Sequence, residues 1–450
     1  MSRTYLAGAA VALMAIFCSS PASAQEEQEP RDEIAALEAD SQAAYEAGRH
    51  LSFFIANRKL NELRPYNPEY LANMVRACAL MGRRSNAYQY MLDMQQQGLA
   101  WDFDATEDTR DIRNSETYVY INGLMVEAGN PAGEGAVAFN VPGDPSDFEA
   151  IAWDESRQKF LLGTLSEGSL VAVGDDGESE VLLQANEKNG LWSIYGLAVD
   201  APRNRLWVAS SATPDFSRFS PAVKAGSALS EFNLETLELQ NRYMLPADQL
   251  EHKLGSVAVT EDGHVYVIDQ ANPIVYRKTP AASGLEAFVA SKELTKLTDI
   301  SVSPDHGRIF VSDAALGIWV IDPRAQAAMM LTGPETLNQG GIRGIEFTDG
   351  KLIIMQGDMS PQRLMRLNLD NTGANVAEVS PMAIALDPYE RPGKGVIRGD
   401  SFFYFANQGS EDSKAGALVM RTPLDAGSQI EPPDMRVFKE SMQNPKQQQP

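Results

Sequence analysis

Three charged residues each stand at the opening of an apolar run, where a buried strand is expected to begin: Glu149, Asp299 and Arg343. If these openings meet in space, the two carboxylates could hold hydroxyl groups or a cation, and the guanidinium could anchor an acidic group. The alternative is structural, with Arg343 paired to one of the carboxylates in an internal salt bridge, because ion-pair networks also gather polar residues. The residues alone leave both interpretations open.

The sequence offers few other groups for chemistry. None of the four histidines has metal-ligand spacing to another, and His264 and His306 stand in polar turns; the other two are His50 and His252. The patterns of a serine nucleophile elbow, a phosphate-binding loop and an HExxH zinc site do not occur. No established catalytic motif therefore identifies a reaction.

A repeated pattern of apolar runs occupies residues 134–425. Each unit has a strand, a polar turn, a second strand with a small or polar end and a third strand after a glycine, as in LTDISVSPDHGRIFVSDAALGIWVID (297–322). Equivalent aliphatic positions are separated by 46, 60, 43 and 45 residues; they are Ile151, Leu197, Val257, Ile300 and Ile345. A sixth, more degenerate unit occupies residues 395–420. This spacing predicts a mainly β fold, a six-bladed β-propeller.

Two further segments bear on the ring. Residues 135–142, GAVAFNVP, could supply the outer strand that closes the last blade. Residues 211–226 are an insertion that accounts for the 60-residue spacing. This insertion is either a solvated loop, a lid over one channel mouth or a contact for the N-terminal region, and we slightly favour the lid.

The N-terminal part has a different texture. Residues 25–127 show apolar positions at helical spacing, and Ala47-Gly48 and Met81-Gly82 lie 34 residues apart, as in tetratricopeptide-type repeats. We therefore expect a small all-α helical-repeat domain at 25–127, the propeller at 128–430 and a disordered, Pro- and Gln-rich tail at 431–450.

The first 24 residues read as a secretory signal peptide with cleavage before Gln25, which predicts export, to a bacterial periplasm or beyond the cell. Cys78 would then be the only cysteine, so no intramolecular disulfide is expected. The net charge of −23 argues against nucleic-acid partners and membrane surfaces, and no apolar stretch predicts membrane insertion.

Two of the repeat units resemble a known family. FEAIAWD (148–154) and LTDISVSPDHGRIFVSD (297–313) are similar to the blade openings of gluconolactonase/regucalcin-like six-bladed propellers. The resemblance spans roughly residues 134–425 and implies a divalent cation, calcium or zinc, in the central channel. It implies Glu149 and Asp299 as metal ligands, with Tyr195 and Ser256 at two other inner openings. Arg343 departs from the family, which has an aspartate there.

Two functions follow as hypotheses. The first is an exported binding module that recognises a small polar ligand at the channel, or a protein partner through the helices. The second is a metal-dependent hydrolase of lactones or related esters, as the resemblance implies. Glu149 and Asp299 on one centre with Arg343 turned away would favour the hydrolase, whereas an Arg343 bridge across them would exclude it.

Overall fold

The computed structural model describes residues 14–15, 29–220, 226–245, 250–408 and 416–427. The expected tail at 431–450 and most of the expected signal peptide lie outside the described residues. Within that signal peptide, β1 (Met14–Ala15) pairs with the edge of one sheet. Among the described residues, none of the helices combines the length and apolar character needed to cross a bilayer.

The described N-terminal part is helical, with two short 3-10 segments between the last two helices. Its elements are α1 (Glu29–Glu46), α2 (His50–Leu63), α3 (Pro68–Leu80), α4 (Arg84–Gln96), η1 (Phe103–Ala105), η2 (Glu107–Ile112) and α5 (Glu116–Glu127). The ends of α1 and α3 are followed by Gly48 (φ +68°) and Gly82 (φ +72°), which take the left-handed conformation that commonly ends a helix. The side chains of Asn67 and Ser115 accept hydrogen bonds from the first turns of α3 and α5. The tetratricopeptide-like character of these helices stays a prediction.

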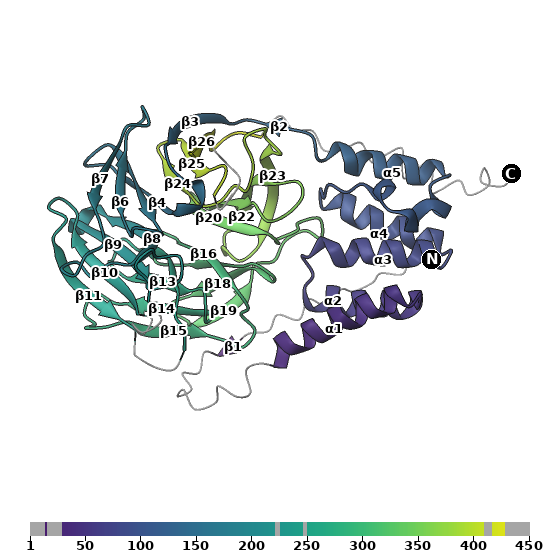
Figure 1. Ribbon diagram of the computed structural model, residues 1–450, viewed down its shortest axis with the longest axis horizontal. Coiled ribbons are helices and arrows are strands. Elements are labelled where there is room, and N and C mark those ends of the chain that lie inside the picture. Colours follow the sequence, from purple (N-terminus) through teal and green to yellow (C-terminus); the bar gives the residue numbers. More distant parts are fainter. Residues whose placement is uncertain (1–13, 16–28, 221–225, 246–249, 409–415, 428–450) are drawn as a thin grey trace.

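The rest of the described chain forms six antiparallel sheets, which confirms the six-bladed β-propeller (Figure 1). Each sheet is one blade, and its strands are given below from the innermost to the outermost. The blades are β4 (Phe148–Asp154), β5 (Lys159–Thr164), β6 (Leu170–Val173), β7 (Ser179–Leu183); β8 (Ser193–Asp200), β9 (Arg205–Ser211), β10 (Ser227–Asn233), β11 (Leu239–Met244); β12 (Leu254–Val259), β13 (Val265–Asp269), β14 (Ile274–Lys278), β15 (Glu286–Ala290); β16 (Leu297–Val302), β17 (Ile309–Asp313), β18 (Gly317–Asp322), β19 (Ala327–Met330); β20 (Ile342–Thr348), β21 (Lys351–Gln356), β22 (Arg363–Leu369), β23 (Val376–Ile384); and β24 (Gly395–Arg398), β25 (Ser401–Phe405), β26 (Ala417–Pro423), β3 (Ala136–Val141). We number them one to six in this order.

The ring is closed by the strand that precedes the first blade. β3 pairs antiparallel with β26, with Val141 opposite Ala417, so the expected role of residues 135–142 is confirmed. A short strand, β2 (Ala132–Gly133), adds to the edge of β23. Joining an early strand to the last blade ties the two ends of the propeller together and protects the edges of the terminal blades.

The core lies between neighbouring blades. Middle strands such as β13 are buried along their whole length, because each blade is covered by a neighbour on both faces. At the closure, the ring of Phe160 in blade one lies 4.9 Å from Phe403 of blade six and 5.0 Å from Phe139 of the closing strand. These aromatic contacts bury apolar surface where the first and last blades meet.

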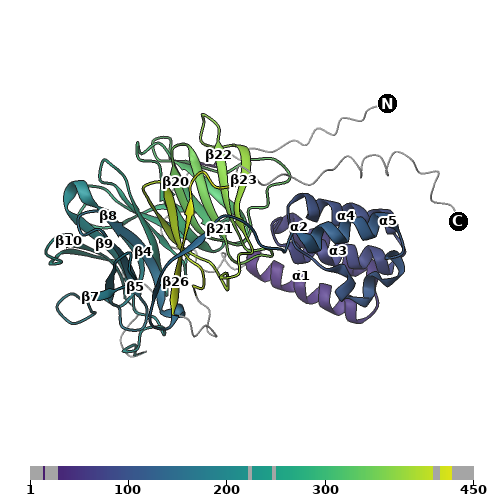
Figure 2. The same ribbon diagram turned by 90° about the horizontal axis from the view of Figure 1, so that it is seen from above.

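The helical domain lies to one side of the propeller (Figure 2). Hydrogen bonds and apolar contacts join it to blade five. The buried Arg363 guanidinium donates from Nη1 to the carbonyl oxygens of Gln97 (2.9 Å) and Gly98 (3.1 Å), just after α4. A Cβ at position 98 would lie 2.8 Å from that nitrogen, so glycine permits the close approach. The backbone N–H of Ala100 donates to Ser360 O at 3.0 Å.

Candidate functional site

The innermost strands share a local irregularity where they begin. In β4, β8 and β20 the pairing with the second strand shifts by one residue, and the extra residues are Glu149, Tyr195 and Arg343. A β-bulge of this kind re-aims a side chain and is common beside functional sites. We call this end of the ring the mouth, and the opposite end, where each innermost strand turns into the second strand, the far face.

The register differs from the expectation at two of the five positions. In β16 the extra residue is Thr298, and Asp299 pairs with Ser312 in the regular ladder. In β12 the register shift falls between Leu254 and Val257, and Ser256 stands one residue beyond Gly255, which takes the bulge position. The expected set is therefore not one ring of equivalent side chains, because Asp299 and Ser256 stand where the other blades have Ala150, Gly196 and Gly344.

The buried Asp299 carboxylate joins two blades. One oxygen accepts the N–H of Ile300 at 3.0 Å, and the other accepts the N–H of Ile345 in β20 at 2.8 Å. Burial raises the pKa of Asp299, and the nearby charge of Lys394 opposes this shift. Both oxygens are thus occupied by backbone donors, which fixes the packing of blade five on blade four.

The charge partner of Glu149 is Lys394, which directly precedes β24. Lys394 Nζ lies 3.1 Å from Glu149 Oε1 and donates to the carbonyl oxygen of Tyr195 at 3.0 Å. The exposed fractions of the two side chains are 8% for Lys394 and 21% for Glu149. Gln408 Nε2 donates to Glu149 O at 3.0 Å and to its Oε2 at 3.3 Å. The ammonium therefore links blades six, one and two at the mouth.

Tyr195 is buried and points to the insertion. Its hydroxyl lies 2.5 Å from Asp215 Oδ2 and 2.6 Å from Thr213 Oγ1. Burial raises the pKa of the buried Tyr195 most, the contact with Asp215 raises it further, and the contact with Thr213 lowers it. Lys253 Nζ lies 4.2 Å from the Tyr195 ring centroid and 4.0 Å from Asp215 Oδ2. Burial lowers the pKa of Lys253, and the carboxylates of Glu149 and Asp215 oppose that shift. The insertion thus brings a carboxylate to the mouth.

The described part of the insertion, up to residue 220, packs over blade one. Ser217 N donates to Ser166 O at 2.8 Å, and Arg218 Nη2 donates to Ala185 O at 2.7 Å. Phe216 is buried in the apolar cluster between blades one and two. These contacts place the segment beside the mouth and against the propeller, and not against the helices.

Arg343 is turned away from Glu149 and Asp299. Its Nη1 lies 3.4 Å from Asp358 Oδ2, and Asp358 Oδ1 accepts a hydrogen bond from Arg391 Nε at 3.0 Å. The buried Nε of Arg343 has no hydrogen-bond partner among the described residues. Arg343 therefore makes neither the internal bridge to Glu149 nor the one to Asp299, and its carboxylate partner is Asp358.

A further carboxylate lies deeper in the ring. Glu346 Oε2 accepts a hydrogen bond from Ser301 Oγ at 3.1 Å, between blades four and five. Burial raises the pKa of Glu346 to about 8, and the negative charge of Asp299 adds to the shift. At neutral pH this group is largely protonated and supplies little charge to the channel.

The side chains at the mouth do not fit a resident divalent cation. Such an ion needs carboxylate oxygens free to ligate, and here Glu149 faces the Lys394 ammonium and Asp299 is held by two backbone N–H groups. The described residues gather three potential His, Cys, Asp or Glu ligands within 4.8 Å at another place, not at the mouth. A lysine occupies the charge-balancing role that the resemblance assigns to a metal.

The sequence located part of this site. Glu149, Tyr195 and Arg343 share the bulge position and line the mouth, whereas Lys394, Lys253 and Asp215 were missed. The signal for Lys394 was present, since Lys394-Gly395-Val396 repeats the arrangement of Arg343-Gly344-Ile345 in the degenerate sixth unit.

No protein-family model matches the sequence, and a search of curated proteins finds no relative. Solved structures with a similar chain course include a protein provisionally assigned as a gluconolactonase, at 12% identity and a TM-score of 0.46 over 66% of this chain and 93% of that one. A calcium-binding regucalcin from Agrobacterium tumefaciens gives 13% identity and 0.46 over 67% and 97%. A luciferin-regenerating enzyme gives 11% and 0.45 over 66% and 97%. At these identities the likeness concerns the fold alone, and in fold this chain is similar to gluconolactonase- and regucalcin-type propellers.

Proposed function

We propose that this protein is an exported binding module whose propeller mouth recognises a small polar ligand carrying an acidic group. The observation that carries the proposal is the Lys394–Glu149 pair, which puts a protein cation where a metal-dependent hydrolase needs its metal. The lactone- or ester-hydrolase alternative would require Glu149 to leave this pair.

The charge at the mouth favours an anionic group on the ligand. The whole chain carries a net charge of −23, yet cationic side chains gather around this end of the ring: Lys253, Lys296, Arg343, Arg391 and Lys394. Arg343 has a contact of 3.4 Å with the carboxylate of Asp358, and a guanidinium can bind a carboxylate in a planar, two-pronged geometry. The neighbouring Asp215, Asp358 and Gln408 could accept or donate hydrogen bonds to hydroxyl groups.

The test is a thermal-shift screen of small organic acids, including sugar acids, dicarboxylates and amino acids. We expect a hit whose stabilisation is lost in Arg343→Gln and kept in Lys351→Gln, a control on the far face. Binding that is unaffected by Arg343→Gln would contradict the proposed site.

The hydrolase alternative is tested by calcium calorimetry and a lactone screen on the same protein. Calcium binding or lactone hydrolysis that disappears in Glu149→Gln would overturn the proposal in favour of the metal-dependent hydrolase. Calcium suits this test because it prefers the oxygen ligands that the mouth could offer.

A further inference from the structure

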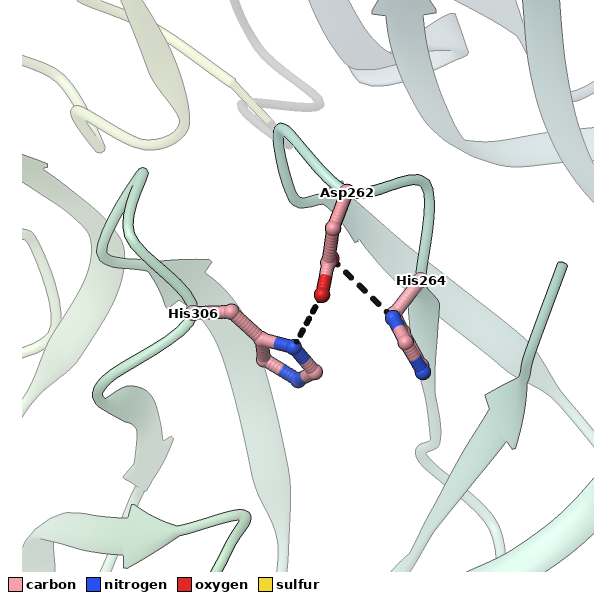
Figure 3. A group of neighbouring side chains, drawn as sticks. All are labelled: Asp262, His264 and His306. Carbon is pink, nitrogen blue, oxygen red and sulfur yellow. Dashed lines mark hydrogen bonds and ion pairs between the residues drawn. The ribbon is translucent and has the colours of Figure 1, made fainter.

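Two turns on the far face bring three potential metal-binding side chains together (Figure 3). Their spacing in the sequence does not indicate this. Asp262 and His264 belong to the turn between β12 and β13, and His306 belongs to the turn between β16 and β17. Asp262 and His306 are 44 residues apart along the chain, but their blades, three and four, are neighbours in the ring. Spacing along the sequence did not indicate this cluster, because its two turns belong to different blades.

The carboxylate of Asp262 lies between the two imidazoles. Its Oδ1 is 3.0 Å from His264 Nδ1, and its Oδ2 is 2.9 Å from His306 Nδ1. The two imidazole centroids are 4.4 Å apart, and the potential ligand atoms of all three residues lie within 4.8 Å of one another. The Nδ1 atoms of both histidines thus face the same carboxylate group.

Surrounding groups hold this arrangement. Tyr266 hydroxyl lies 2.6 Å from His306 Nε2, which occupies the outer nitrogen of that ring and directs Nδ1 toward Asp262. Thr260 Oγ1 donates to Asp262 Oδ1 at 2.5 Å. His306 has a φ of +55°, a left-handed conformation that is uncommon for a residue other than glycine. In metal sites, a hydrogen bond to the outer ring nitrogen, such as the one between Tyr266 and His306 Nε2, orients the histidine ligand.

The positive side chains beside the cluster have their own acidic partners. Arg203, whose guanidinium approaches Gly263 of the same turn, lies 2.8 Å from Asp200. Arg277, which interacts with Tyr266, lies 2.6 Å from Glu286. Asp262 is half exposed, so solvent or a further ligand can reach the cluster.

We propose that Asp262, His264 and His306 bind a divalent transition-metal ion of the zinc class and so link blades three and four at the far face. Two imidazole nitrogens with one carboxylate oxygen suit Zn²⁺, Ni²⁺ or Cu²⁺, whereas Ca²⁺ and Mg²⁺ prefer oxygen ligands alone. Three protein ligands leave one position of a tetrahedral ion for water.

The three side chains must adjust to bring their donor atoms around one ion. Zinc bonds to nitrogen and oxygen are about 2.0–2.2 Å long, so the donor atoms of a tetrahedral site lie roughly 3.3 Å apart. The separations of 3.0 and 2.9 Å, from the two Nδ1 atoms to different oxygens of Asp262, would widen by a few tenths of an ångström, and any separation near the 4.8 Å limit of the cluster would contract. A neutral imidazole that ligates through Nδ1 carries its proton on Nε2, and for His306 that N–H would donate to the Tyr266 hydroxyl oxygen.

The test is zinc calorimetry on the full chain, with thermal unfolding measured with and without zinc. We expect one zinc ion per chain, a zinc-dependent rise in Tm, and loss of both in His264→Gln/His306→Gln. His50→Gln, a control in the helical domain, should keep both. Glu149→Gln should also keep zinc binding, which separates this site from any cation at the mouth.

Tyr266→Phe supplies a variant that leaves all three ligands in place. Loss of its hydroxyl should weaken zinc binding about 10–100-fold, the usual cost of removing such an outer partner. If the double histidine variant fails to fold, Cu²⁺ bound to the wild type should show nitrogen coupling from two imidazoles in its electron spin resonance spectrum. Absence of zinc binding, zinc binding that survives the double variant, or a copper spectrum without that coupling would overturn the proposal.

Discussion

The carboxylates at the mouth and at the far face of this propeller have different kinds of partners. At the mouth, Glu149 has a lysine ammonium from another blade at 3.1 Å, and Asp299 has backbone donors on both oxygens. At the far face, Asp262 accepts a hydrogen bond from the Thr260 hydroxyl and lies against two imidazole nitrogens, which can exchange a hydrogen bond for a coordinate bond to a metal.

The contrast shows why a count of carboxylates is a poor guide to metal binding. A carboxylate whose partner is a fixed cation or an N–H group of the ladder is part of the fold, and using it for a ligand requires breaking that contact. A carboxylate flanked by histidine nitrogens on exposed turns can change partners at little cost. The following predictions test each side of this comparison.

Breaking the pair at the mouth should have the largest effect. Lys394→Met removes a buried ammonium and leaves the Glu149 charge without its partner, which should cost about 3 kcal/mol in the free energy of unfolding. Urea denaturation at neutral pH measures the change.

The double variant Lys394→Met/Glu149→Gln is the matched control, because it removes both charges. We expect it to recover most of the stability lost in Lys394→Met. If the single variant is as stable as the wild type, the pair does not organise the mouth. If Lys394→Met gains calcium affinity, the lysine does take the place of a cation.

Glu346 provides a pH-dependent test of the channel interior. Its pKa is raised from 4.5 to about 8, so between these values the folded state holds a proton that the unfolded state has released. Stability should therefore fall as the pH rises through this window and level off above pH 8. The limiting slope for one proton is about 1.4 kcal/mol per pH unit, and since Glu346 is only partly buried we expect a total of roughly 2 kcal/mol.

Urea midpoints at pH 5, 6, 7 and 8 give the measurement, with Glu346→Gln as the comparison. The variant cannot ionise, so its stability should change less over this range than that of the wild type. Equal slopes for the two proteins would show that Glu346 titrates normally and that the interior is more hydrated than its surroundings indicate.

The fold was largely predictable because it is repetitive. Apolar runs at near-regular spacing determine the blades, and even the closing strand at 135–142 could be recognised from its position before the first unit. The mouth was harder, because side-chain direction there depends on a bulge of one residue, which the pattern of apolar residues does not register. That is why Asp299 and Ser256 were assigned to a position that belongs to Thr298 and Gly255.

Contacts between separate repeats were harder still. The pairing of Lys394 with Glu149 spans 245 positions and exists only because the ring closes, so neither local spacing nor composition contains it. The same holds for His264 and His306, whose turns meet because consecutive blades lie side by side. Equivalent positions in successive repeats therefore deserve comparison as neighbours in space.

A smaller effect is expected for the link between the mouth and the insertion. Tyr195→Phe removes the hydroxyl that contacts Asp215 and Thr213, and it should cost about 1 kcal/mol because Asp215 remains exposed to water. Limited proteolysis of the insertion should become faster in this variant. Unchanged stability together with unchanged cleavage would show that the insertion is held by its packing on blade one alone.

The smallest effect on stability is expected at the far face. Without added metal, His264→Gln should change the free energy of unfolding by less than about 0.5 kcal/mol, because its contact with Asp262 is a solvent-accessible pair on a turn. With zinc present, the same variant should lack the rise in Tm that the wild type shows. A large loss of stability in the absence of zinc would mean that the histidine cluster is structural in its own right, as the mouth is, and the difference between the two faces would disappear. If the variant and the wild type are equally stable without zinc and differ only when zinc is present, the far-face cluster serves to bind a ligand. The stability of the metal-free protein would then not explain why two imidazoles face one carboxylate.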